Sequence, residues 1–331
     1  MSFPEFTVAR PASLAEAVRL LAENGPDSMI IAGGTDVVPN LNMKLFTPRV
    51  LVDIKGLREL KGMEWEPEGG LRIGALASLS EIAESPLVRE KYSVLAEAAE
   101  LVASPLQRNM GTIGGNLCLE TRCLWYNQSY FWRKACGFCL KKDGDVCHVA
   151  PGGKRCWAVW SGDTAPALLT LNAEIEIVGP QGSRRMPLKN FYPNDGMNRI
   201  DLARDEILSG VYIPAQTADL RGRYLKLRVR NSIDYPLAGV AVAIKTDDSG
   251  TCVDVRVALT AVNPAPRLVE RAAEYLLGNK PSRERIEEVA YQAIRTAKPL
   301  TTSVTTPEYR REMIRVFTKR ALAECWNANG N

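Results

Sequence analysis

Most of the cysteine and histidine side chains, which are common metal ligands, lie in one short stretch of the chain. The segment CLETRCLWYNQSYFWRKACGFCLKKDGDVCHVAPGGKRCW runs from Cys118 to Trp157 and holds six of the eight cysteines and the only histidine, His148. Thiolates and imidazole bind zinc, and four thiolates also hold an iron–sulfur cluster. Because cytosolic thiols stay reduced, such clustering favours metal binding over disulfides.

The residues alone leave two kinds of metal site open. Cys136 and Cys139 have the C-x2-C spacing of a zinc knuckle, which Cys147, His148 and Cys156 could complete. A 4Fe–4S cluster takes the same number of cysteines. A non-redox binding protein with a zinc knuckle is therefore an alternative to a redox protein.

Two glycine turns have the composition of a phosphate-binding site. IIAGGTD places Gly33 and Gly34 directly after an apolar strand, and GTIGGN repeats the arrangement at Gly114 and Gly115. Glycine lets backbone N–H groups approach a phosphate, because no Cβ intervenes. Neither turn reads G-x-G-x-x-G, and we expect neither to lie in the βαβ unit of a Rossmann site. Considered alone, each motif is more simply explained as a tight turn than as a phosphate-binding site.

The elements around these motifs predict an α+β protein. PASLAEAVRLLAENG predicts a helix over 11–25, capped by Ser13 and ended by Gly25. SVLAEAAELVASPLQRNMG, residues 93–111, predicts one helix followed by a turn. From about residue 221, three alternating strands precede a series of helices, which predicts a separate C-terminal domain.

Composition excludes several functional classes. A chain of 331 residues is expected to form two or three domains. The net charge of +4 is small and the basic residues form no run, so we expect no nucleic-acid partner. No apolar run approaches the roughly 20 residues that span a bilayer. The first residues lack a signal pattern, so we expect a cytoplasmic protein without membrane contact.

Four motifs occur in a recognisable order. AGGTD near residue 35, RIGAL near 74, RNMGTIGGN near 112 and GDTAPALL near 165 resemble the FAD-binding medium subunits of the molybdenum hydroxylases, the xanthine dehydrogenase family. The resemblance covers nearly the whole chain. It implies an α+β fold with an FAD-binding domain of the p-cresol methylhydroxylase and vanillyl-alcohol oxidase type at 1–219, in subdomains of about 1–56 and 57–219. The C-terminal α+β domain, a three-stranded sheet with helices, would occupy 220–331.

The resemblance also implies an FAD site. The first glycine turn would wrap the pyrophosphate with backbone amides, and the second would hold the other side of the diphosphate and the ribityl chain. Asp163 would hydrogen-bond the cofactor, and Lys226 would reach toward the flavin ring, where a cation stabilises anionic reduced flavin. Without the resemblance, Lys226 would be interpreted as an exposed strand lysine. The implied FAD-binding residues are Ile30, Ile31, Ala32, Gly33, Gly34, Thr35, Asp36, Val37, Thr112, Gly115, Asn116, Asp163 and Lys226.

The cysteines then fall in an insertion at about 118–160. In most of the family the acidic segment follows the second glycine turn closely, whereas here 46 residues separate Asn116 from Asp163. An insertion with little core of its own can be ordered by a metal centre. ETRCLWYNQSYFWR, CLKKDGDVCHV and RCWAVWSGD resemble the β subunits of 4-hydroxybenzoyl-CoA reductases, which carry a 4Fe–4S cluster there. The implied ligands are Cys123, Cys139, Cys147 and Cys156. Cys118 and Cys136 are left over, although Cys136 could replace a neighbour, and His148 is expected to pack nearby.

The resemblance implies partners as well. They are a large subunit with molybdenum and molybdopterin cytosine dinucleotide, a small subunit with two 2Fe–2S clusters, and a ferredoxin-like electron donor, in a dimer of heterotrimers. Electrons would pass from the donor through the 4Fe–4S cluster and FAD to the partner's clusters, for reductive dehydroxylation in anaerobic aromatic degradation. An aldehyde- or N-heterocycle-oxidising molybdenum hydroxylase is the alternative. We expect no catalytic residue here, because the chain has no nucleophile elbow, H-E-x-x-H or P-loop. The insertion also has basic residues, which could attract an acidic ferredoxin or, as the simpler expectation, form a solvated face; among them are Arg133, Lys134, Lys141, Lys142, Lys154 and Arg155.

Overall fold

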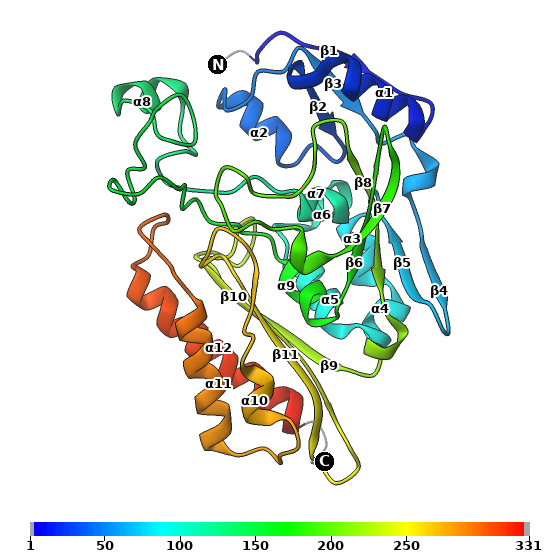
Figure 1. The fold of residues 1–331 in the computed structure, drawn as a ribbon, viewed down its shortest axis with the longest axis vertical. Coiled ribbons are helices and arrows are strands. Elements are labelled where there is room, and N and C mark those ends of the chain that lie inside the picture. The colour runs from blue at the N-terminus through cyan, green and yellow to red at the C-terminus, as the bar shows by residue number, and fades with distance from the viewer. Residues whose placement is uncertain (1–2, 328–331) are drawn as a thin grey trace.

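The N-terminal segment forms a small parallel sheet in the computed structural model, which describes residues 3–327 (Figure 1). The strands β1 (Thr7–Ala9), β2 (Ser28–Ile31) and β3 (Val50–Asp53) pair in the order β1-β3-β2. Helix α1 (Leu14–Asn24) packs its apolar side on this sheet. The Ser13 hydroxyl accepts the N–H of Glu16, and Gly25 ends the helix at a φ of 49°, so the predicted helix and both caps are confirmed.

The first glycine turn lies between two parallel strands. The chain leaves β2, turns through residues 32–36 and enters the short helix α2 (Val37–Asn42) before returning as β3, which pairs with β2. The connection β2-α2-β3 is a short βαβ unit, but its turn lacks the G-x-G-x-x-G pattern of a Rossmann site. Its helix has only 6 residues and contains Pro39, so no helical periodicity revealed it in the sequence.

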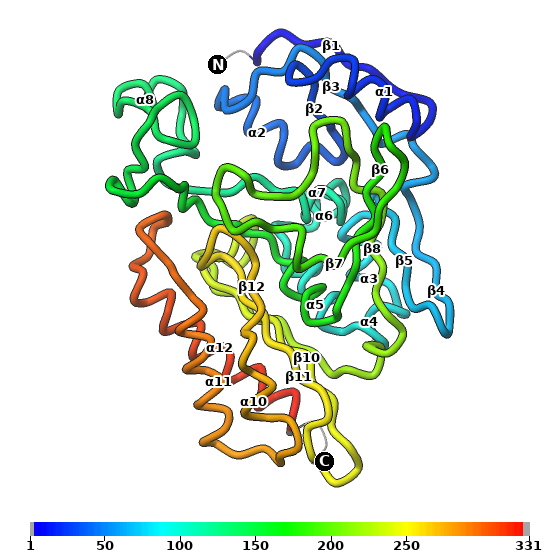
Figure 2. Tube along the Cα trace, in the orientation of Figure 1, coloured from blue at the N-terminus to red at the C-terminus, as the bar shows by residue number. Residues whose placement is uncertain are grey.

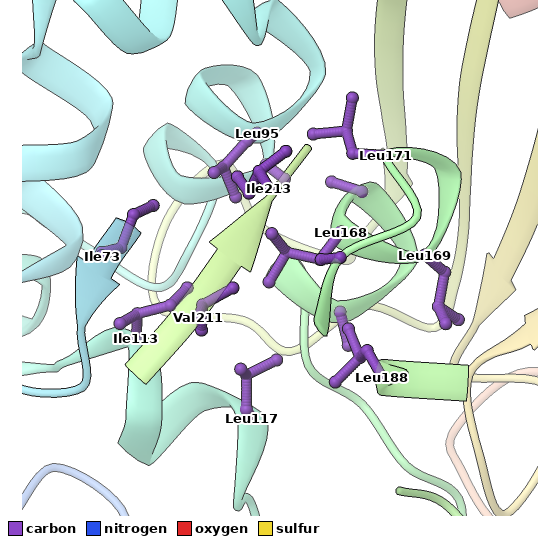
Figure 3. Close-up of a cluster of buried hydrophobic side chains, with 14 of the residues drawn as sticks. Ile73, Leu95, Ile113, Leu117, Leu168, Leu169, Leu171, Leu188, Val211 and Ile213 are labelled. Carbon is purple, nitrogen blue, oxygen red and sulfur yellow. The ribbon is translucent and has the colours of Figure 1, made fainter. Parts of the chain in front are cut away.

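The central part is a five-stranded antiparallel sheet in the order β4-β5-β8-β6-β7. Its strands are β4 (Met63–Glu66), β5 (Gly70–Gly74), β6 (Glu174–Gly179), β7 (Gly182–Pro187) and β8 (Ile207–Ile213). The helices packed with it are α3 (Leu79–Glu84), α4 (Pro86–Lys91), α5 (Ser93–Glu100), α6 (Pro105–Met110), α7 (Ile113–Leu117) and α9 (Thr164–Thr170). Figure 3 shows Ile73 and Val211 of the sheet facing Ile113 of α7 and Leu168 of α9. This core fixes α7 and α9, which flank the insertion.

The segment 93–111, predicted as one helix followed by a turn, contains two helices. The chain leaves α5 after Glu100, adopts a φ of 42° at Ala103, and starts α6 at Pro105. Proline fits the first turn of a helix but not its interior, so the break falls before it. The break matters because α6 leads directly into the second glycine turn.

The C-terminal domain is a four-stranded antiparallel sheet in the order β12-β11-β10-β9, covered by helices (Figure 1). The bounds are β9 (Arg221–Leu227), β10 (Ala238–Thr246), β11 (Cys252–Thr260), β12 (Arg267–Leu268), α10 (Ala272–Leu276), α11 (Arg283–Thr296) and α12 (Pro307–Asn327). The three predicted strands and the following helices are present. The prediction of only three strands was wrong, because β12 has 2 residues and is too short to show an alternating pattern.

The insertion has little regular structure. Between α7 and α9 it contains one helix, α8 (Tyr130–Ala135), and its loops lie at one edge of the molecule (Figure 2). It contacts the N-terminal part through Arg133, whose guanidinium donates to the carbonyl of Met43 at 3.2 Å. It contacts the C-terminal domain through the Leu124 N–H, which donates to the carbonyl of Thr302 at 3.0 Å. Within residues 3–327, no helix is both long and apolar enough to cross a membrane.

Candidate functional site

The two glycine turns pack backbone against backbone. A Cβ added to Gly33 would lie 1.8 Å from the carbonyl oxygen of Met110, the residue before the second turn. Gly34 has a φ of 73°, which side-chain-bearing residues rarely adopt. The loop at 32–36 therefore requires glycine at both positions, one for the close approach and one for the backbone conformation.

The first turn presents free backbone donors. In the described part of the chain, the N–H groups of Gly33, Gly34 and Thr35 have no hydrogen-bond acceptor. Thr35 is exposed, and so is Gly115 in the second turn. Successive N–H groups without a Cβ in the way suit an anion such as a diphosphate. Of the other predicted residues here, Ile30 and Ile31 end β2, Ala32 follows them, and Val37 starts α2.

The second turn is braced internally. Thr112 caps α7 by accepting the Gly115 N–H on its hydroxyl at 3.1 Å. Asn116 accepts both the N–H and the hydroxyl of Thr164 on its Oδ1, at 3.2 and 2.6 Å. The Thr112 side chain thus caps α7, and the Asn116 side chain holds α7 to the start of α9.

Asp163 and Lys226 form a fully buried ion pair. Lys226 Nζ donates to Asp163 Oδ2 at 3.0 Å and to the carbonyl of Leu101 at 2.8 Å, and the two side chains are 1% and 3% exposed. The Tyr224 hydroxyl donates to Asp163 Oδ1 at 2.7 Å. Burial raises the pKa of Asp163, and the Lys226 ammonium opposes that rise. The alternative of an exposed strand lysine is therefore wrong.

Asp36, in the first glycine turn, joins three parts of the molecule. Its carboxylate pairs with the Arg122 guanidinium and accepts the hydroxyl of Tyr235 at 3.2 Å. It also accepts the N–H of Glu120 at 3.4 Å. Arg122 stacks on the Tyr235 ring, 3.8 Å from its centre, and directly precedes Cys123. The glycine turn and the insertion are therefore in direct contact.

The four predicted ligand cysteines meet around one cavity. Cys123, Cys139, Cys147 and Cys156 line a small cavity of about 20 Å³ and are each at least nine-tenths buried. Cys118 and Cys136 do not line it. Among residues 3–327, no three His, Cys, Asp or Glu side chains are placed to share one metal ion. Four thiols around one cavity are the ligand set of a zinc ion or of a 4Fe–4S cluster, in which each iron takes one thiolate.

The thiols are buried in mostly apolar surroundings. Burial raises the pKa of Cys123 to about 12 and that of Cys156 to about 11, so without a metal both are protonated at neutral pH. The Ala158 N–H points at Cys156 Sγ from 3.4 Å, a contact that favours thiolate sulfur. His148 also lines the cavity, where its ring stacks 4.6 Å from that of Trp125 and Nε2 contacts the Phe138 carbonyl. His148 is thus a packing residue in this structure.

Two residues expected on a solvated basic face are buried. Arg133 is fully buried, and burial lowers its pKa. Lys141 has a side chain only 6% exposed and pairs with Glu120. No sequence signal marked either residue, because burial of a charge depends on acceptors that other segments supply. Lys141 lies two residues after Cys139, and Arg122 directly precedes Cys123. This closeness in sequence to a predicted ligand shows that each lies near the cavity, but it does not show that the side chain is buried.

The family models and the related proteins that match this chain all point to the same family. Residues 4–216 match the family described as the FAD binding domain in molybdopterin dehydrogenase, and residues 223–325 match the CO dehydrogenase flavoprotein C-terminal domain. The aldehyde oxidoreductase FAD-binding subunit of Escherichia coli (strain K12) is 34% identical over 278 residues, which cover 81% of this chain and 84% of that protein. The nicotinate dehydrogenase FAD-subunit of Eubacterium barkeri is 31% identical over 285 residues, covering 86% and 83%.

The fold agrees with that of a solved relative. A chain of carbon monoxide dehydrogenase from Hydrogenophaga pseudoflava, in a form that lacks the Mo-pyranopterin moiety of its cofactor, superposes with a TM-score of 0.80. The match has 28% identity and covers 98% of this chain and 99% of that one. With a glycine cradle that suits a diphosphate and two domains that match from end to end, the chain belongs to the FAD-binding medium subunits of the molybdenum hydroxylase family.

Proposed function

We propose that this subunit transfers electrons between FAD at the glycine turns and a 4Fe–4S cluster held by Cys123, Cys139, Cys147 and Cys156. The observation that carries the proposal is that these four thiols line one buried cavity, outside which Cys118 and Cys136 lie. When bound, the two cofactors supply one- and two-electron redox chemistry. The residues of this chain bind them, exclude water and fix nearby charges.

For FAD, the proposed site keeps all the residues expected from the sequence. The free N–H groups of Gly33, Gly34 and Thr35 would bind the pyrophosphate, and the exposed Gly115 would approach its other side. Lys226 is already bonded to Asp163 and Leu101. We therefore assign it an electrostatic role toward the flavin rather than a free, reaching side chain. The proposed arrangement is the two-subdomain grip of the p-cresol methylhydroxylase type, with subdomains 1–56 and 57–219 and the C-terminal domain at 220–331.

We favour an iron–sulfur cluster over zinc because of the flavin context. Four cysteines alone suit either centre. A redox centre next to a flavin has a use in electron transfer that zinc lacks. The non-redox zinc-knuckle protein is thereby the less supported candidate.

The proposed complex contains two further subunits. These are a large subunit with molybdenum and molybdopterin cytosine dinucleotide and a small subunit with two 2Fe–2S clusters, paired as a dimer of heterotrimers in the cytoplasm. A ferredoxin-like donor would approach the insertion. Support for that approach comes from exposed aromatic side chains there, with Phe131 74% exposed. Trp132, also exposed, lies 5.7 Å from Trp125 on the cavity wall.

Two substrate classes are supported by different observations. The segments around the cysteines support 4-hydroxybenzoyl-CoA reductase, in which this subunit would feed electrons toward reductive removal of a phenolic hydroxyl. The 34% identity to an aldehyde oxidoreductase subunit supports an aldehyde- or N-heterocycle-oxidising complex. Nothing in this chain would contact the organic substrate, so the partner subunit decides between them.

A spectrum with metal analysis tests the proposal. The purified complex should show flavin bands with a broad iron–sulfur absorption and about eight irons per heterotrimer, of which about four belong to this subunit by cluster stoichiometry. Zinc together with only about four irons would reject the cluster. Turnover of 4-hydroxybenzoyl-CoA with a low-potential reductant, compared with aldehyde oxidation by a dye, then separates the two substrate classes.

A further inference from the structure

A buried cation lies against the cysteine cavity. Lys141 is one of the residues that line it. Its Nζ donates to Glu120 Oε1 at 2.6 Å and to the carbonyl of Gly196, and lies 4.9 Å from the centre of the Tyr126 ring. The side chain is 6% exposed, so water and salt screen its charge little.

The counter-charge is incomplete. Glu120, 8% exposed, pairs with Lys141 through one oxygen and with Arg199 through the other, at 3.8 Å from Nε. Burial alone would raise the pKa of Glu120, but the cations Lys141 and Arg199 outweigh it and lower that pKa. The group therefore combines two basic side chains with one carboxylate, and Lys141 is the member of the three that lines the cavity.

The position of the Lys141 ammonium group is fixed relative to Cys156, one of the four proposed cluster ligands. Gly196, whose carbonyl Lys141 binds, touches Cys156 so closely that a Cβ there would lie 2.6 Å from Cys156 Sγ. The Gly196 N–H donates to the Cys156 carbonyl at 3.1 Å, and the Thr121 hydroxyl donates to the Gly196 carbonyl at 2.6 Å. Lys141 is thus bound to a residue that packs directly against the Cys156 thiol.

We infer that Lys141 is a positioning residue that sets the reduction potential of the cluster through its fixed positive charge, with Glu120 as the opposing element. The inference rests on the proposed 4Fe–4S cluster. A cation stabilises the more electron-rich state of a nearby redox centre, and net charge and hydrogen bonding are principal determinants of cluster potentials. Lys141 therefore makes the cluster easier to reduce by an external donor.

The test uses two variants of the intact complex, one that removes a positive charge and one that removes a negative charge. Lys141→Met should shift the midpoint potential of the cluster to a lower value, and Glu120→Gln should shift it to a higher one. The double variant should return close to wild type. Lys142→Met is the matched control, because Lys142 is the next residue but is one-third exposed and paired with Asp143; it should leave the potential unchanged. The measurement is a redox titration followed by the cluster's EPR signal at about pH 8, where Glu120 stays ionised.

The possible outcomes separate this inference from the proposed function. Iron and flavin analysis shows whether each variant still contains its cluster and its FAD. If Lys141→Met loses iron, the direction of the potential shift in Glu120→Gln alone tests the inference. Unchanged potentials, or shifts of the same sign in both variants, would overturn the role of Lys141. Wild-type complex without the iron of a 4Fe–4S cluster would reject the proposed function instead.

Discussion

The glycine turns and the cysteine cavity are built from different kinds of atoms. The glycine turns present backbone N–H groups. Their shape follows from the end of a strand, a helix cap and one close contact between Gly33 and Met110. The cavity works through side chains on loops with a single six-residue helix. A backbone site of this kind is set by the fold itself, whereas the side-chain site needs buried polar contacts and, under our proposal, its metal to hold the loops in place.

The largest effect should come from removing one thiol from the cavity. Cys156→Ser should lose about four irons per subunit, because each iron of the cluster takes one cysteine. FAD should remain, since the glycine turns lie outside the insertion. The measurement is iron and flavin content of the purified complex. Cys118→Ser is the control, because Cys118 does not line the cavity; if it loses iron while Cys156→Ser keeps it, the ligand assignment is wrong.

A complementary change should remove flavin and spare iron. Gly33→Ala would place a Cβ 1.8 Å from the Met110 carbonyl and force the two turns apart. We expect the protein to purify with little FAD and with its iron intact. Gly56→Ala is the matched control, because a Cβ at Gly56 meets nothing within 4 Å. Full flavin in Gly33→Ala would show that the turns do not form the cradle.

A smaller effect is expected on stability from the buried ion pair. Lys226→Met leaves the Asp163 carboxylate buried without its cation and should lower the free energy of unfolding by about 3–5 kcal/mol. Lys245→Met, on the neighbouring strand, breaks an exposed pair with Asp219 and should cost about 0–1 kcal/mol. Denaturant unfolding of both variants measures the difference. Equal stability of the two would mean that the pair is not buried in solution.

The sequence predicted elements whose signals are local. The cap at Ser13, the turn at Gly25 and the alternating strands β9, β10 and β11 each follow from a few adjacent residues. Strand β8 was not recognised, although it lies between β5 and β6 in the central sheet. Its sequence, ILSGVYI, has Ser209 and Gly210 in the middle of an apolar run, and its pairing with the distant strands β5 and β6 defines it.

The same limit applies to the site. The glycine motifs and the four cysteines could be picked out by residue type and by family resemblance. The burial of Lys141 could not, because Glu120 and the Gly196 carbonyl that surround it come from segments 21 and 55 residues away. A buried charge is defined by its acceptors, and the sequence near Lys141 looks like that of an ordinary surface lysine.

The way in which Arg133 holds the insertion has an evolutionary consequence. On the N-terminal part of the chain it binds only main-chain carbonyls, those of Met43 and Lys44, at 3.2 and 3.0 Å. Every amino acid supplies a carbonyl, so the receiving surface does not depend on which side chains occupy those two positions. An ancestral flavin domain could therefore have acquired this loop without compensating substitutions at Met43 and Lys44, the two positions that accept hydrogen bonds from its arginine.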